Sequence, residues 1–306
     1  MFALMTMIVQ QLVNGITQGG LYALLAISYA LVYGVMSLVN FSTGSIYMMG
    51  AVSGWLVCNF FMESFFLSVV VGFCVGFAVA FVLEKLAFRS IRGASRISSL
   101  ICTIGFSQLI NEVAALTFGK ATKGMPAFFT QELFSVAGVR ISLLQVVLVL
   151  TVIILLVALQ LLVYKTRMGL AIRTVSMDNK AAGLMGINVD RTISIAFSLA
   201  GACAAIAGIA GCVYYRSVSA YMGWMPGIKS FSAAVFGGLS SMPGAILGGY
   251  LMGIIENFGV QIFSTGYRDG TCSTLFKYTV ISFLVLIIFL LVRPQGLLGK
   301  KKITKV

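Results

Sequence analysis

The sequence predicts an all-α membrane protein, a polytopic bundle of about eight transmembrane helices in one domain covering residues 1–306. Charged residues make up only 9% of the chain and hydrophobic residues 59%, whereas soluble domains carry charge on roughly a quarter of their residues. Segment 65–83 runs for 19 residues without a charge, close to the ~20 residues with which a helix crosses ~30 Å of hydrocarbon. Glycines four residues apart, such as Gly72 and Gly76, let membrane helices approach closely.

Hydrophobic segments separated by short polar connections predict the individual helices. They cover residues 10–34, 42–62, 65–84, 98–118, 142–164, 192–214, 230–263 and 275–292. As one straight helix, segment 230–263 would be about 51 Å long, too long for the hydrocarbon core without extreme tilt. Pro243 lacks the amide hydrogen that a continuous helix needs. We therefore expect a break at 240–244 and a hairpin of two short helices.

The positions of lysine and arginine predict the orientation of these helices. Fourteen of the 21 basic residues fall in 85–97, 165–191 and 293–306, and such basic loops stay on the cytoplasmic side. The other seven fall in 119–142, 214–230 and 264–277, which alternate with the basic stretches and which we expect outside. This pattern places the N-terminus outside and the C-terminus in the cytoplasm.

The residue types exclude several classes of function. The chain contains no histidine, so neither a Ser-His dyad nor a His-ligated zinc site can form. No aspartate lies in a predicted span, the six cysteines show no C-x-x-C spacing, and no G-x-x-x-x-G-K-[ST] loop is present. The basic residues that give the net charge of +13 lie between the hydrophobic runs and do not form a basic face. We expect no catalytic site, no metal, no cofactor and no nucleic-acid partner.

Two acidic residues, Glu112 and Glu256, lie inside hydrophobic segments. A charge at a helix centre costs about 2.5–3.5 kcal/mol on the insertion scale, so each should face protein or a water-filled cavity. They either line a pathway or lie near the membrane interface, and the sequence leaves both interpretations open.

Residues 10–51, QQLVNGITQGGLYALLAISYALVYGVMSLVNFSTGSIYMMGA, closely resemble the first segments of LivH-type permeases of the branched-chain amino acid ABC importers. Three further blocks resemble that family in the same order: RTVSMDNKAAGLMGINVDRTISIAFSLAGACAAIAG at 173–208, GIKSFSAAVFGGLSSMPGAILGGYLMGIIE at 227–256 and LVRPQGLLG at 291–299. Segment 52–172 matches mainly by hydropathy.

The resemblance implies a multi-pass permease subunit in a bacterial cytoplasmic membrane that translocates branched-chain or other small amino acids. The implied partners are a second, LivM-like permease, two cytoplasmic ABC ATPases that bind the ATP, and an extracytoplasmic amino-acid-binding protein, with membrane lipid around the helices. An ion-coupled secondary transporter or channel for a small polar solute such as urea or an amide is the alternative, with Glu112 or Glu256 as its ion site.

The most specific functional block lies within the 165–191 loop. Lys180, Ala181, Ala182 and Gly186 look like the Glu-Ala-Ala-x-x-x-Gly signature of ABC importer permeases, with Lys180 at the Glu position. The resemblance implies a cytoplasmic coupling helix that docks on an ATPase, its small residues permitting close approach. An Ala/Gly-rich cytoplasmic turn is the structural alternative.

Two further groups are candidates for the solute pathway. The first is Asn40, Ser42, Thr43 and Gly44, where family members often have His-Gly-Glu over 43–45. Asn40 or Ser42 also suits a helix N-cap. The second is Ser240, Ser241 and Gly244. Where a helix breaks at membrane depth, its unpaired amide and carbonyl groups must form hydrogen bonds with protein or water. Packing of Gly244 and its neighbouring glycines against another helix is the alternative explanation of the break.

Overall fold

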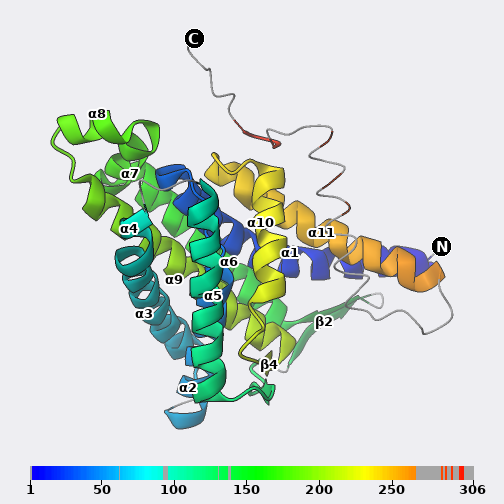
Figure 1. Ribbon diagram of the computed structural model, residues 1–306. Helices are drawn as coiled ribbons and strands as arrows, with labels where there is room; N and C mark the ends of the chain where they lie inside the picture. The colour runs from blue at the N-terminus through cyan, green and yellow to red at the C-terminus, as the bar shows by residue number, and fades with distance from the viewer. Residues whose placement is uncertain are drawn as a thin grey trace. The chain divides into compact units, whose positions relative to one another are not determined.

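The computed structural model describes residues 2–61, 63–91, 96–129, 131–136, 139–266 and 296–299, with 284, 287 and 291. Its helices are α1 Phe2–Met36, α2 Thr43–Phe60, α3 Phe65–Leu83, α4 Arg89–Ile91, α5 Arg96–Phe118, α6 Leu143–Lys165, α7 Arg167–Met177, α8 Asn179–Leu184, α9 Val189–Tyr215, α10 Trp224–Gly237 and α11 Met242–Gly266 (Figure 1). A π-helical turn, η1 Glu84–Phe88, joins α3 to α4.

Four short strands complete the described elements. They are β1 Lys123–Gly124, β2 Glu132–Val136, β3 Val139–Ser142 and β4 Ser217–Val218. β1 pairs with β4 and β2 with β3, both antiparallel. Strands this short do not change the fold class, and the prediction of an all-α membrane protein is confirmed.

Five of the described helical segments are long and apolar enough to cross a membrane. They are Met5–Met36, Phe65–Ile91, Ile97–Phe118, Leu143–Lys165 and Val189–Tyr215. Their ends agree with the expected spans to within a few residues, with two exceptions: the first begins earlier than residue 10, and Phe65–Ile91 ends seven residues beyond the expected end at 84. The expected span 275–292 lies outside the described residues apart from 284, 287 and 291. The count of about eight spans therefore stays a prediction.

Segment 230–263 is broken as expected, at 238–241 instead of 240–244, and the second helix is long, with 25 residues. α10 ends at Gly237 and α11 begins at Met242. Gly238 turns the chain with φ +107°, a conformation that favours glycine. Pro243 is the second residue of α11, where a missing amide hydrogen costs no helical hydrogen bond. The first of the two helices starts at Trp224, six residues before the expected start.

The chain forms two compact units. Unit 1 comprises residues 1–26, 129–152 and 229–306, and unit 2 comprises 27–128 and 153–228. In unit 2, α9 packs against both α2 and α3 through small residues. A Cβ added to Gly50 or Gly208 of this interface would overlap the backbone of the facing helix. Close backbone contact therefore fixes the position of α2 against α9, and α2 carries part of the site described below.

In unit 1, α1 packs against α11 in the same way. A Cβ on Gly15 would lie 2.9 Å from the Cα of Ile254, and one on Gly19 would lie 2.9 Å from the Cα of Tyr250. On the α11 side, a Cβ on Gly253 would overlap Gly19. The small residues thus bring the two helix backbones into contact, as the four-residue glycine spacing predicts.

Candidate functional site

The predicted coupling block forms α8, a six-residue helix fixed at both ends. At its start the Asp178 carboxylate accepts hydrogen bonds from the amides of Lys180 (2.8 Å) and Ala181 (3.1 Å). At its end the amide of Gly186 donates to the carbonyl of Gly183 and that of Ile187 to the carbonyl of Ala182, both at 3.1 Å. These paired bonds, with Gly186 at φ +83°, form a Schellman motif.

Ala182 does not face outward from this helix. It is fully buried in an apolar cluster with Val35, Ile172, Val175, Ile193 and Ala196, and Ile187 packs on that cluster. Packing of α8 on α7 and α9 within the chain accounts for the small side chain of Ala182, and a part for Ala182 in a contact with an ATPase stays a prediction. Gly186 has open space around its Cα, so its backbone conformation explains the glycine.

The outer surface of α8 is apolar where an exposed loop would be expected to be polar. Leu184 is 89% exposed and Met185 82%, and Met177 at the end of α7 is 88% exposed. Figure 1 shows α7 and α8 together at one end of the helices of unit 2. Exposed apolar side chains of this size indicate a contact surface. Sequence reasoning singled out the small residues of this block and passed over Leu184 and Met185 beside them.

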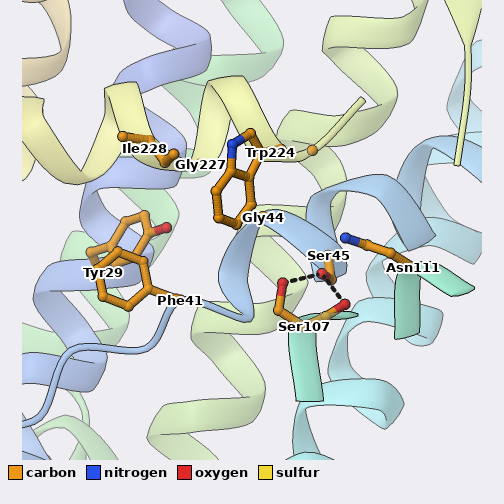
Figure 2. Close-up of a pocket in the computed structure, with 10 residues that line it drawn as sticks. Tyr29, Phe41, Gly44, Ser45, Ser107, Asn111, Trp224, Gly227 and Ile228 are labelled. Atoms are coloured by element: carbon orange, nitrogen blue, oxygen red, sulfur yellow. Dashed lines mark hydrogen bonds between the residues drawn. The ribbon is translucent and has the colours of Figure 1, made fainter. Parts of the chain in front are cut away.

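A small pocket in unit 2 contains part of the first pathway group (Figure 2). Hydroxyl and amide groups meet aromatic rings and glycine backbone in its wall, which is lined by Tyr29, Phe41, Gly44, Ser45, Ser107, Asn111, Gly223, Trp224, Gly227 and Ile228. The hydroxyls of Ser45 and Ser107 are 2.7 Å apart, and the Ser45 hydroxyl also lies 3.0 Å from the Ser107 carbonyl oxygen. The lining offers neutral hydrogen-bonding groups beside an apolar wall.

The pocket is narrow. Its interior volume is about 10 Å³, at the lower limit for one water molecule. A Cβ on Gly44 would lie 2.6 Å from the carbonyl oxygen of Gly223, and one on Gly227 would lie 3.1 Å from the Cα of Gly44. Backbone contact between the start of α2 and the start of α10 therefore closes this place to anything as large as an amino acid.

Of the first predicted group, Gly44 lines the pocket, while Asn40, Ser42 and Thr43 build the turn before it. The Asn40 side-chain oxygen accepts a hydrogen bond from the Ser42 amide at 2.9 Å, and the Thr43 hydroxyl donates to the Asn40 carbonyl at 3.0 Å. Ser42 is the N-cap residue of α2, but its side chain makes no capping hydrogen bond. The partners that sequence reasoning missed, such as Ser107 and Trp224, come from distant segments.

The second predicted group lies in unit 1 and makes structural contacts. The Ser241 hydroxyl accepts a hydrogen bond from the Gly244 amide at 3.3 Å, which caps α11. Gly244 packs against Gly237, where an added Cβ would overlap the backbone, and Ser240 is exposed. These contacts agree with the packing explanation of the break, and a place for this group on a solute pathway stays a prediction.

The two intramembrane acids differ in their surroundings. Glu112 is exposed, and its carboxylate accepts a hydrogen bond from the Tyr221 hydroxyl at 3.0 Å. Glu256 is fully buried, with its Oε1 atom 2.7 Å from the Nζ atom of Lys229. Lys229 was expected in an external connection, but it lies in α10 and is only 8% exposed. The fold brings Lys229 and Glu256 together, and their separation in the sequence does not indicate this pairing.

A second buried acid escaped the sequence reasoning. Glu84 begins the π-helical turn and is fully buried, and its carboxylate accepts a hydrogen bond from the Ser194 hydroxyl of α9. Arg89, one turn further on, pairs with Asp190 at 3.0 Å on the surface. Both contacts tie the η1–α4 segment to the start of α9, close in sequence to α8.

Comparison with known proteins covers nearly the whole chain. The family described as branched-chain amino acid transport system / permease component matches residues 11–291. The chain is 35% identical to the high-affinity branched-chain amino acid transport system permease protein LivH of Escherichia coli K12, over 97% of both chains. It is 34% identical to the corresponding BraD protein of Pseudomonas aeruginosa, again over 97% of both chains.

A more distant relative extends the likeness to an archaeon. The probable branched-chain amino acid transport permease protein LivH of Methanocaldococcus jannaschii is 30% identical over 94% of this chain and 91% of its own length. The broken segment and the short helix α8 lie within the matched residues, and so do the apolar helices except for the first nine residues of α1. The chain therefore belongs to the family of permease components of branched-chain amino acid transport systems.

Proposed function

We propose that this chain is the solute-conducting subunit of an ATP-driven importer that carries a branched-chain or similar small amino acid. The observation that carries the proposal is the family match over residues 11–291, together with relatives whose names specify that transport. In this proposal the chain has no catalytic site of its own. A second permease, two ATPases and an extracytoplasmic binding protein supply the remaining parts of the machine.

The surface around α8 suits the contact with an ATPase. Leu184 and Met185 form an exposed apolar tip, and the caps at both ends of α8 hold this tip rigid. A rigid projection transmits a displacement to α9, which follows α8 directly and packs on α2 and α3. Lys180, Ala181 and Gly186 are exposed beside the tip and belong to the same proposed contact.

The pocket in unit 2 is then a closed point on the solute pathway. Its neutral polar groups suit an amino acid passing without tight binding, and the Gly44–Gly223 contact closes it to solute. Because glycines form the contact, a small separation of the two backbones widens the opening.

The test of the proposed function is purification of the chain with its partners. Leucine-loaded binding protein should stimulate ATP hydrolysis by the complex, and a complex indifferent to every branched-chain amino acid would contradict it.

The orientation of α8 gives a separate prediction. Asn179 is exposed at the start of α8, and the basic 165–191 loop should lie in the cytoplasm. In a cysteine-free background, Asn179→Cys should resist a membrane-impermeant thiol reagent applied to intact cells and react after permeabilisation. Labelling of Asn179→Cys in intact cells would show that α8 lies outside the cell, where it cannot contact a cytoplasmic ATPase.

A further inference from the structure

Carboxamide side chains form a row along one face of α1 in unit 1. Gln10, Asn14 and Gln18 follow at intervals of four residues, which places them on the same side of the helix. The Gln10 amide donates to the Asn14 side-chain oxygen at 3.3 Å, and Gln145 of α6 donates to the same oxygen at 3.0 Å. Gln11 donates to Gln261 of α11 at 2.9 Å.

The row ends at the buried ion pair. Asn257 donates to the Gln18 side-chain oxygen at 2.8 Å, and the Gln18 amide lies 3.4 Å from Glu256 Oε1, which also accepts from Lys229. Burial rises along the row: Asn14 is half-buried, whereas Gln18 is 6% exposed and Glu256 fully buried. From Gln10 to Gln18 the row covers about 12 Å along the helix axis.

Packing alone does not require these polar groups. The glycines of α1 and α11 already bring the two backbones into contact. A buried ion pair is often no more stabilising than well-packed apolar residues, because desolvation offsets the attraction. Charges within membrane helices therefore point to a function, and a row of amides leading to a charge pair points to a polar solute.

We propose that this row, the polar track, receives the head group of a zwitterionic amino acid and leads it to Lys229 and Glu256. Carboxamides both donate and accept hydrogen bonds, so they suit a solute that carries both charges. At the inner end the solute carboxylate binds Lys229 and its ammonium group binds Glu256, while the two side chains release each other. In the described state the two side chains neutralise each other. The inference rests on the proposed amino-acid transport, and under the predicted orientation the track opens from the outside.

The first test removes both charges together in the complete transporter. Lys229→Met with Glu256→Gln keeps the shapes and leaves no unpaired buried charge. Initial leucine uptake into proteoliposomes should fall about ten-fold or more, since hydrogen bonds to charged groups are the strong ones. Stimulation of ATP hydrolysis by loaded binding protein should stay within about two-fold, because both side chains are buried and do not lie on the surface that a docked protein touches. Thr17→Val removes a buried hydroxyl that donates to the Val13 carbonyl of its own helix, and this control should transport normally.

Three outcomes decide the inference. Uptake within about two-fold of wild type after loss of both charges would overturn it and leave the pair a packing element. Failure of the wild-type complex to import any amino acid would instead contradict the proposed function. Rapid leakage of leucine through the double variant without ATP would overturn the inference and show instead that the ion pair keeps the pathway closed.

A second measurement decides the matter if the double variant does not assemble. In a cysteine-free background, Asn14→Cys on the polar track should react with a small hydrophilic thiol reagent about ten-fold faster or more than Leu12→Cys, because the reactive thiolate needs water. Leu12 is 42% exposed on another face of α1, where lipid should cover it. Equal reaction rates would overturn the inference.

Discussion

Leu184→Glu is expected to lower ATP-driven uptake about ten-fold or more, because it would place an unpaired carboxylate in an apolar contact with the ATPases. Leu184 is 89% exposed on α8. The chain itself therefore accepts a glutamate there without steric cost. The lower uptake should come from a weaker contact with the ATPases. The measurement is leucine uptake by the reconstituted complex, together with the amount of ATPase that co-purifies with the chain.

The control at this position is Leu184→Met, which keeps an apolar side chain and should keep both uptake and co-purification near wild type. A Leu184→Glu complex that retains its ATPases and transports normally would remove α8 from the coupling assignment. Ala182→Leu is not an equivalent test, because Ala182 is fully buried and a larger side chain disturbs the cluster beneath α8.

Gly208→Ala should destabilise the protein, although it adds only one methyl group. A Cβ at this position would overlap the carbonyl oxygen of Tyr47, so α9 and α2 must move apart. Overpacking of this kind costs about 1–3 kcal/mol, and here the obstacle is backbone. We expect a thermal midpoint in detergent lower by at least a few degrees.

Gly105→Ala is the matched control for Gly208→Ala. Gly105 also lies in a membrane helix, α5, but nothing lies within 4 Å of its added Cβ. Alanine favours the helix over glycine by roughly 0.5–1 kcal/mol, so this variant should be as stable as wild type or more stable. Equal losses in both variants would show that the α2–α9 contact does not limit stability.

The helices were predictable because each hydrophobic run stops at charged or turn-forming residues. Pro243 likewise predicted the division of segment 230–263, since a proline is tolerated in the first turn of a helix and not in its interior. These are local effects, which the sequence within one segment contains. The start of α10 at Trp224 was missed because residues 214–230 were assigned to an external connection, whereas Pro226 lies in the first turn of the helix, where proline is tolerated.

The sites were less predictable because they depend on packing between distant segments. Ala182 matched a signature, but only the fold shows that it faces α7 and α9. Lys229 was assigned to a loop by its charge, although Glu256 pairs with it 27 residues later. The pocket combines the start of α2 with Ser107 of α5 and Trp224 of α10. Their spacing in the sequence does not indicate that these residues lie together.

The source of energy for uptake tests the central claim most directly. The chain is reconstituted in vesicles with its second permease, ATPases and binding protein, and labelled leucine is supplied without an ion gradient. We predict uptake that requires hydrolysable ATP on the ATPase side and stops with a non-hydrolysable analogue. Uptake by this chain alone, driven by a proton or sodium gradient and indifferent to ATP, would contradict the account.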